Sequence, residues 1–521
     1  QCVKYSCSLV GAMRFTLPAA DRTGWNDASF RGANQIPTPN IDAIAYNGIV
    51  LDRHYTLPSC SPSRAALLTG KYPIRMAGHA DGIPLEEKLL PEYLRELGYV
   101  TRLVGKWHVG YHNTSMTPLS RGFDSHFGYY NGYVGYWDGV HEWFNNSRGY
   151  DCYRDGERRK EEVEGKYLTD VYTEEAVKII ENHGVSERPL FLLISHLAPH
   201  TGAIGVLESR DEAVTSKKYS YIKDPLRRTY AALDDSLGAV VEALDTTNML
   251  QNSIIVFISD NGGPTSYPSV VLQNSASNWP LRGVSKMSVF EGGVRGVAAV
   301  WSPLFKNPKR SSAGYMHISD WLPTLYSAAG GNVEMLNDLD GLNQWDYLVY
   351  DRTKSPRSEL LVNIWERVGD WAIIKDEWKL VKGKLGRSDG RDVLNLVANS
   401  PVSKALRRNQ PLGALRREYE MRRADLDMTR TALCANRIST SEAVPFPGPN
   451  PCNEKPCLFN IREDPCEFHD VAIQHPSVVD ELKELYESHA ARLVKEQDHG
   501  FDPAAEPELW GGWWAPWLDS S

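Results

Sequence analysis

The chain has 521 residues, of which 42% are hydrophobic and 24% charged, which is the composition of a globular protein long enough for two to four domains. With a formal net charge of −9, it lacks the basic balance typical of proteins that bind nucleic acid or anionic membranes. No apolar run reaches the roughly 18 residues that cross a bilayer. We therefore expect neither a nucleic-acid partner nor a membrane span.

The N-terminal segment gives the weakest pattern. The chain begins at Gln1 without a signal peptide, which indicates a processed or incomplete N-terminus and leaves secretion open. Residues 13–17 predict only a short strand, because polar side chains interrupt it and Pro18 follows. Residues 37–48 then predict a helix that ends in glycine, and residues 49–51 begin a strand.

The next helix is predicted to begin at a cysteine, Cys60. A proline follows two residues later, Ser61 or Ser63 could cap the first turn, and Gly70 ends the helix. A group at position 60 would face backbone N–H donors at the positive end of the helix, with Arg64 one turn away, and such an arrangement binds anions. A buried or disulfide-bonded cysteine beside a helix cap is the alternative interpretation.

Alternating strands and helices follow, and they predict an α/β fold with a mostly parallel sheet and helices on both faces. The expected helices cover residues 91–97, 170–182 and 228–244, and the expected strands cover residues 101–105, 189–194 and 253–259. Polar residues come directly after these three strands: Lys106 and His108, His196 and His200, Asp260 and Asn261. In open α/β sheets, ligands bind at the carboxyl ends of the strands.

Two of these residues have the chemistry of metal ligands. Asp260 and Asn261 offer hard oxygen atoms, which suit Ca²⁺ or Mg²⁺ better than a soft metal. A simple turn after the strand is the alternative. Residues 129–143 are rich in Tyr, Trp and Gly, which is typical of core packing and also suits a loop over the face of a sugar.

We expect a catalytic domain over residues 1–366 and a smaller C-terminal α+β domain over residues 367–521. Residues 371–382 predict a hairpin, residues 475–495 an amphipathic helix, and residues 510–517 an aromatic clamp on the main domain. The Arg-rich insertion near 403–430 is either a solvated or disordered segment or a surface for sulfated polysaccharide.

The cysteines give mixed evidence about the redox compartment of the protein. Four of the eight lie between residues 434 and 466, as in a disulfide-bonded domain, and a zinc site is disfavoured by the spacing of Cys452 and Cys457. If Cys60 is reserved, an odd number remains, and Cys152 is the candidate for the unpaired thiol. Asn113 and Asn145 begin triplets that fit the N-glycosylation pattern.

The segment around Cys60 resembles the first signature of the sulfatase family, Cys-x-Pro-Ser-Arg followed by Thr-Gly, and residues 98–108 resemble the second signature. Runs at 279–283, 291–296 and 317–325 are most similar to the arylsulfatase B type within that family. The resemblance covers nearly the whole chain. It implies an alkaline-phosphatase-like fold and an enzyme that hydrolyses sulfate esters.

The resemblance also implies roles for individual residues. Cys60 would be oxidised to formylglycine by the formylglycine-generating enzyme, and its hydrate would attack sulfur and release the alcohol. Arg64 would hold the hydrated aldehyde, His108 would act as the base for its regeneration, and His200 would protonate the leaving group. Lys106 and Lys286 would bind sulfate oxygens. The expected ligands of Ca²⁺, with Mg²⁺ as the alternative ion, are Asp21, Cys60, Asp260 and Asn261.

Three positions depart from the family pattern. Arg22 stands where the family has a second ligand aspartate, and a guanidinium cannot bind a cation. The segment from Arg282 to Glu291 is one residue longer than the pattern, which affects the alignment of Lys286. His200 lies in Ala-Pro-His, where the family more often has His-Glu-Pro, so His196 competes for its role.

Three functions are compatible with these observations. The first is a lysosomal or secreted sulfatase that acts on the 4-sulfate of N-acetylgalactosamine in chondroitin or dermatan sulfate. Arg22 motivates the second, a catalytically impaired homologue that binds sulfated glycans. The third is a phosphate or phosphonate ester hydrolase on the same fold.

Overall fold

A computed structural model describes residues 14–20, 23–31, 38–76, 82–143, 146–184, 186, 188–202, 207–210, 225–264, 276–286, 288–351, 354–384, 451–495 and 500–519. Several sequence predictions lie outside these ranges: the ligand Asp21, its neighbour Arg22, the glycosylation site at Asn145 and the Arg-rich segment 403–430.

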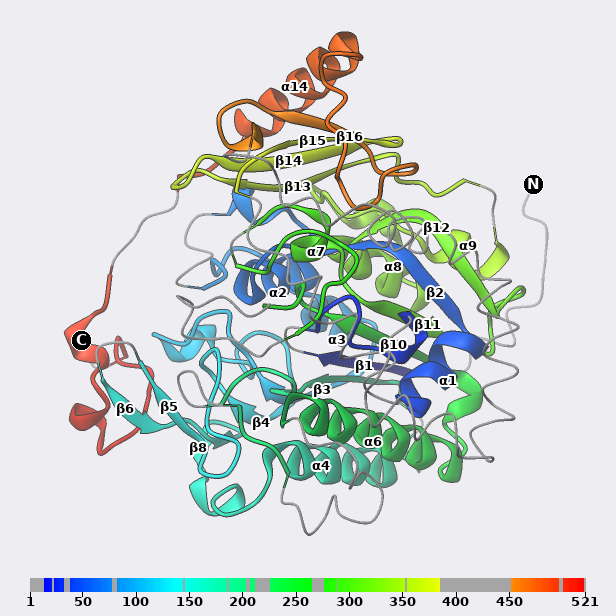
Figure 1. Ribbon diagram of the computed structural model, residues 1–521. Helices are drawn as coiled ribbons and strands as arrows, with labels where there is room; N and C mark the ends of the chain where they lie inside the picture. Colours follow the sequence, from blue (N-terminus) through cyan, green and yellow to red (C-terminus); the bar gives the residue numbers. More distant parts are fainter. Residues whose placement is uncertain are drawn as a thin grey trace.

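A ten-stranded sheet runs through the centre of the molecule (Figure 1). Its strands, in spatial order, are β12 (Arg310–His317), β2 (Ile49–Tyr55), β11 (Ala298–Trp301), β10 (Ser253–Ser259), β1 (Arg14–Ala20), β9 (Leu190–Ser195), β3 (Val100–Lys106), β4 (Ser125–Tyr129), β7 (Tyr153–Arg154) and β8 (Glu157–Arg158). Strands β10, β1, β9, β3 and β4 are mutually parallel, whereas β11 is antiparallel to both of its neighbours. The mostly parallel α/β sheet is confirmed.

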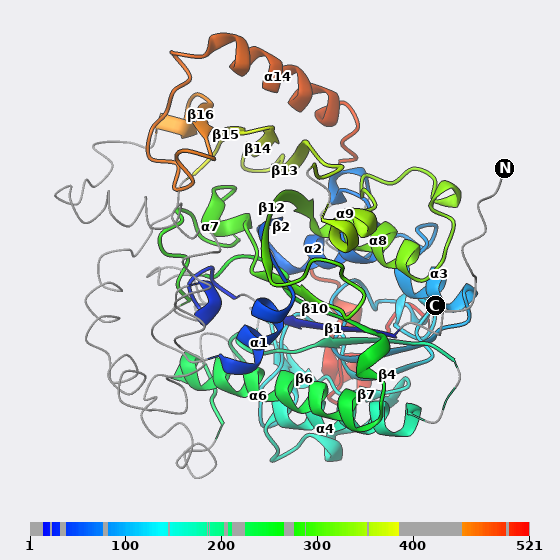
Figure 2. The same cartoon turned by 90° about the vertical axis from the view of Figure 1, so that its right-hand side faces the viewer.

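Helices cover both faces of this sheet (Figure 2). One face packs on α1 (Pro39–Asn47), α4 (Leu168–His183) and α6 (Pro225–Thr246), and the other on α2 (Cys60–Thr69), α3 (Leu90–Glu96) and α8 (Trp321–Ala328). Side chains of β10 alternate between the two cores: Ile255 and Phe257 enter the first, and Ile254, Val256 and Ile258 the second. This alternation is the period of a strand buried on both faces.

Strand β1 corrects the sequence analysis. The predicted short strand ending before Pro18 is in fact a seven-residue central strand, Arg14–Ala20, buried from Phe15 onward. Its register with β9 is continuous through Pro18, whereas its pairing with β10 skips Leu17 and Pro18. Because proline has no N–H, it cannot donate to a ladder, and pairing on the β9 side keeps the strand intact.

A second sheet contains four antiparallel strands: β13 (Glu359–Trp365), β14 (Asp370–Lys375), β15 (Trp378–Lys382) and β16 (Cys457–Asn460). It lies between the main body and helix α14 (Pro476–Ala490), which covers its outer face (Figure 1). Trp371 and Tyr486 stack there with ring centroids 4.0 Å apart. The predicted hairpin and helix are confirmed. The domain boundary at 366/367 stays a prediction, and the strands of this sheet begin at Glu359.

Most of the sequence predictions about the cysteines are confirmed. Cys452 and Cys457 form a disulfide, and Cys466 is disulfide-bonded as well, so the zinc alternative is wrong for these residues. Cys60 and Cys152 are buried and not disulfide-bonded. In the part of the chain that the structure describes, no helix has the length and apolar character needed to cross a bilayer.

Candidate active site

Cys60 lies at the first turn of α2, as the sequence predicted, and its side chain is buried. Ser59 is the N-cap residue, and Gly70 ends the helix at φ 70°, with its N–H bonded to Ala66 O. The predicted capping by Ser61 or Ser63 is wrong. Ser63 Oγ instead accepts the N–H of Leu57, at 2.9 Å, because its side chain turns back onto the preceding loop.

Arg64 connects α2 to the ends of two central strands. Its Nε donates to the carbonyl of Trp107 at 2.9 Å, and its Nη2 donates to Ser195 Oγ at 2.8 Å and to the carbonyl of Lys106. Its Nη1 lies 4.0 Å from the Asp260 carboxylate. A planar guanidinium can reach all these acceptors together, which makes Arg64 the centre of the site.

His108 follows β3 and is held by both its backbone and its ring. Its φ is 57°, in the left-handed region, and its N–H bonds to Tyr130 O at 3.0 Å. The ring nitrogen Nε2 lies 3.2 Å from Ser61 Oγ, one residue after Cys60. A Cβ at Gly132 would lie 2.8 Å from the same nitrogen, so only glycine leaves room for the ring.

Asp260 and Asn261 follow β10, and the Asp260 N–H bonds to Ala20 O at the end of β1, at 3.2 Å. The Asn261 amide group donates to Gly262 O at 2.7 Å. Its carbonyl oxygen Oδ1 is buried and accepts no hydrogen bond within the described residues. A buried carbonyl oxygen without a hydrogen bond lowers the stability of the fold unless something binds it. Together with the Asp260 carboxylate it offers hard oxygen atoms, which fit Ca²⁺ or Mg²⁺.

The two lysines are placed differently. Lys106 is the fully buried last residue of β3, and its carbonyl accepts from Arg64. Lys286 lies in a loop at φ 63°, and its N–H bonds to Pro58 O at 2.6 Å, two residues before Cys60. The structure therefore brings both lysine backbones beside α2, although 180 residues separate them in the chain.

His200 and His196 have distinct surroundings. His200 Nδ1 donates to Thr201 O at 2.6 Å, and its ring stacks on Tyr133 with centroids 5.5 Å apart. His196 Nε2 lies 2.9 Å from Ser236 Oγ on α6, and burial lowers the pKa of His196 to about 4. His196 thus has a partner on α6, whereas His200 lies against Tyr133 of the aromatic run.

Three residues that join these groups were not predicted from the sequence as site residues. Tyr133 and Gly132 lie in the aromatic run 129–143, where Gly132 faces His108 and Tyr133 faces His200. Ser195, the last residue of β9, bonds to Arg64. Its position at a strand end was the available signal. Among the described residues, no three His, Cys, Asp or Glu side chains converge as a metal site, and the expected ligand Asp21 lies outside them.

Comparisons with known proteins show which family the chain belongs to. Residues 19–331 match the family model described as Sulfatase. Arylsulfatase J of Mus musculus is 32% identical, over 96% of this chain and 79% of that protein. N-acetylgalactosamine-6-sulfatase of Homo sapiens is 34% identical, over 64% of this chain and 65% of that protein. The crystal structure of Ps i-CgsB superposes with a TM-score of 0.70 at 26% identity, over 96% of this chain and 97% of that one.

The fold is that of an alkaline-phosphatase-like hydrolase. The chain belongs to the sulfatase family, and its enzymatic class is sulfuric ester hydrolase. The reported relatives support the family without singling out the arylsulfatase B type that the sequence runs suggested. The family typically depends on Ca²⁺ and formylglycine.

Proposed function

We propose that this protein removes sulfate from sulfated N-acetylgalactosamine residues of glycosaminoglycans, with Cys60 converted to formylglycine as the nucleophile. The observation that carries the proposal is the placement of Cys60 at the start of α2, with Arg64 one turn away and Asp260 4.0 Å from its guanidinium. A relative named N-acetylgalactosamine-6-sulfatase and a structure of Ps i-CgsB in complex with k-i-k-neocarrahexaose support a sulfated carbohydrate substrate.

Each described residue would act from the position given above, and Asp21, outside the described residues, is included from the family resemblance alone. Arg64 orients the residue at position 60, and the cationic groups of Lys106 and Lys286 bind the sulfate oxygens. His108 accepts a proton beside position 60, and His200 donates one to the leaving alcohol. Asp260 and Asn261, with Asp21, would hold a Ca²⁺ or Mg²⁺ ion that neutralises charge at the sulfate. The hydrated formylglycine supplies the nucleophilic hydroxyl.

The first experiment is to produce the chain together with the formylglycine-generating enzyme, confirm conversion of Cys60 by mass spectrometry, and assay 4-nitrophenyl sulfate. Replacing Cys60 by Ala should abolish turnover, because alanine offers no nucleophile. The matched control is Cys152→Ala, which removes the other buried cysteine that is not disulfide-bonded and should keep activity. Equal turnover by Cys60→Ala and the wild type would disprove the nucleophile.

Metal dependence is tested in the same assay. Chelation should remove activity and added Ca²⁺ should restore it, as the oxygen donors of Asp260 and Asn261 suit that ion. Converted protein that binds chondroitin sulfate without turnover, and gains turnover when Arg22 is replaced by Asp, would instead favour the glycan-binding alternative. A higher rate on 4-nitrophenyl phosphate than on the sulfate would favour the phosphatase alternative.

The position of the sulfate is the finer part of the proposal. Sequence resemblance favours the 4-sulfate of chondroitin or dermatan sulfate, whereas the name of one relative points to the 6-sulfate of the same sugar. Release of sulfate from matched 4-sulfated and 6-sulfated oligosaccharides decides between them. We propose a lysosomal or secreted location, which the Cys452–Cys457 disulfide supports, because disulfides persist in oxidising compartments. Loss of mass on treatment with N-glycosidase would support it further.

A further inference from the structure

A cluster of buried charges joins the second sheet to the main body outside the candidate active site. Lys379, on β15, lies with its Nζ 2.8 Å from Glu291 Oε1 and 2.9 Å from Glu467 Oε1. All three side chains are fully buried. Glu291 begins the short helix α7 (Glu291–Val294) in the catalytic part of the chain, so the ion cluster spans the two parts.

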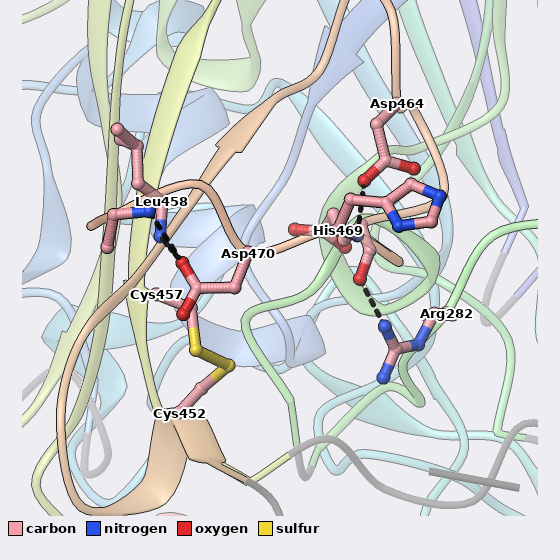
Figure 3. The surroundings of a disulfide bond; sticks show 9 residues. Arg282, Cys452, Cys457, Leu458, Asp464, His469 and Asp470 are labelled. Atoms are coloured by element: carbon pink, nitrogen blue, oxygen red, sulfur yellow. Dashed lines mark hydrogen bonds between the residues drawn. A yellow bond between two sulfur atoms is a disulfide. The ribbon is translucent and has the colours of Figure 1, made fainter. Parts of the chain in front are cut away.

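Glu467 also contacts the catalytic part through its second carboxylate oxygen and its backbone carbonyl. Its Oε2 accepts the N–H of Glu291 at 2.8 Å, and its carbonyl accepts from Arg282. Figure 3 shows Arg282 directed at the turn that carries Asp464 and His469, in which the N–H of His469 bonds to the Asp464 carboxylate at 2.8 Å. The segment from Arg282 to Glu291 is therefore fixed at both ends by one turn of the C-terminal part.

That same segment contacts both halves of the candidate site. Lys286 N–H bonds to Pro58 O at 2.6 Å, beside the start of α2, and Ser285 N–H bonds to Gly263 O at 3.3 Å, beside the loop after β10. Within α7, the carbonyl of Gly293 accepts a hydrogen bond from the N–H of Gly262 at 3.1 Å. Any shift of the segment would move Lys286 relative to Cys60 and Asp260.

We propose that Lys379 and Glu467 are positioning residues that set the location of Lys286 for binding of the sulfate group, an inference that rests on the proposed role of Lys286. A buried ion pair gives little net stability over an apolar replacement. Two directional hydrogen bonds accompany it, however: Lys379 Nζ donates to Glu291 Oε1, and Glu291 N–H donates to Glu467 Oε2. These bonds hold the segment in one position, and an apolar contact would allow it more movement. The second sheet thereby takes part in substrate binding without touching the substrate.

A double-mutant cycle tests this coupling. The double variant Lys379→Met/Glu467→Gln removes one positive and one negative charge. The two substitutions are introduced together into the wild-type protein and into a Lys286→Ala background. We measure kcat and KM for 4-nitrophenyl sulfate and calorimetric binding of inorganic sulfate. In the wild-type background we expect kcat/KM to fall about 10- to 100-fold, as for misplaced binding groups, together with weaker sulfate binding. In the Lys286→Ala background the further loss should be less than about threefold.

The matched control is the surface ion pair between Lys375, on β14 of the same sheet, and Glu481, on α14, whose charged atoms lie 2.7 Å apart. Lys375→Met combined with Glu481→Gln should leave kcat/KM and sulfate binding unchanged. Equal losses in the two Lys286 backgrounds would overturn the proposal, and so would a Lys286→Ala variant that behaves like the wild type.

If the double variant does not fold, Glu467→Gln alone keeps an acceptor for Glu291 N–H and should show a smaller loss with the same dependence on Lys286. An unchanged kcat/KM in that variant overturns the proposal. The proposed function is judged separately, by wild-type turnover and its loss in Cys60→Ala, and the sulfate titration reports on Lys286 even without turnover.

Discussion

Arg64 shows how a single side chain can organise the candidate active site. Its guanidinium donates to two backbone carbonyls and one hydroxyl and faces the Asp260 carboxylate, all with little exposure to solvent. The carbonyls belong to Lys106 and Trp107, so the arginine also fixes the segment that leads to His108. Geometry, more than charge, explains why arginine stands at this position.

Replacement of Arg64 by Lys should therefore fail although it keeps the positive charge. A lysine ammonium is a compact donor that cannot reach all these acceptors, so at least one buried carbonyl loses its partner. We expect a loss of about 1 to 3 kcal/mol in the free energy of unfolding and at least about a 100-fold loss of kcat on an aryl sulfate. Urea unfolding and steady-state kinetics measure the two effects, and near-normal kcat would contradict the positioning argument.

Residue-level prediction from sequence was limited by distance along the chain. Cys60 and Arg64 were located correctly because Pro62 and Gly70 mark the start and the end of a helix through local geometry. The contacts of Ser61 with His108 and of Arg64 with Ser195 join residues 47 and 131 positions apart, and no local pattern encodes them. The site residues were predicted from motifs, while the hydrogen bonds that arrange them required the fold.

At the scale of elements, α1 and β1 show the same limit. Residues 37–48 predicted α1 closely, yet its Thr38 N-cap makes no side-chain capping bond. Instead Asp234 on α6, 193 residues away, accepts the N–H of Ile41 at 2.9 Å. Strand β1 looked weak in sequence because its stability comes from pairing with β9 and β10 on both sides. Tertiary contacts override local propensity in both elements.

Asp42, in the first turn of α1, gives this element a measurable pH dependence. It accepts hydrogen bonds from Ser29 Oγ at 2.6 Å, Phe30 N at 2.9 Å and Thr38 Oγ1 at 2.9 Å, and so ties the helix to the preceding turn. Burial raises the pKa of its carboxyl from 3.8 to about 7, although these hydrogen bonds oppose the shift. The folded protein therefore holds a proton that the unfolded chain releases, and this stabilisation is present at low pH and lost as the pH rises through 7.

Asp42→Asn resembles the protonated form and does not titrate. Relative to this variant, the wild type should lose roughly 2 to 3 kcal/mol of stability between pH 5 and pH 8. Urea unfolding of both proteins at the two pH values measures the difference, and every other titrating group is common to the pair and cancels. A difference that stays constant with pH, or that grows in favour of the wild type, would refute the raised pKa of Asp42.

At the scale of the whole molecule, the chain's last described segment supports the site from a distance. The C-terminal tail lies against β5 (Val140–Glu142) and β6 (Arg148–Tyr150) (Figure 1). Trp514 is buried, and its indole N–H bonds to His141 O at 3.1 Å. The predicted aromatic clamp is confirmed.

The clamp reaches the candidate site through a series of ring contacts. The ring of His141 lies 5.2 Å from Trp514 and 4.7 Å from Tyr133, and Tyr133 stacks on His200. The tail thereby contacts the packing that surrounds the proposed proton donor, although more than 300 residues separate it from His200 in the chain.

Removal of the indole should therefore affect both stability and turnover. We expect Trp514→Ala to lower the free energy of unfolding by about 3 to 5 kcal/mol, as for other large buried aromatic side chains, and to reduce kcat on an aryl sulfate at a temperature where the variant remains folded. Leu509→Ala is the control, because Leu509 lies in the same tail and is 69% exposed.

Since His200 would protonate the leaving group, the loss of kcat in Trp514→Ala should be smaller for substrates whose leaving alcohol needs no proton, such as those with acidic phenols. A variant that is destabilised but retains wild-type kcat on an alkyl sulfate would show that the tail serves stability alone, with no effect on the placement of His200.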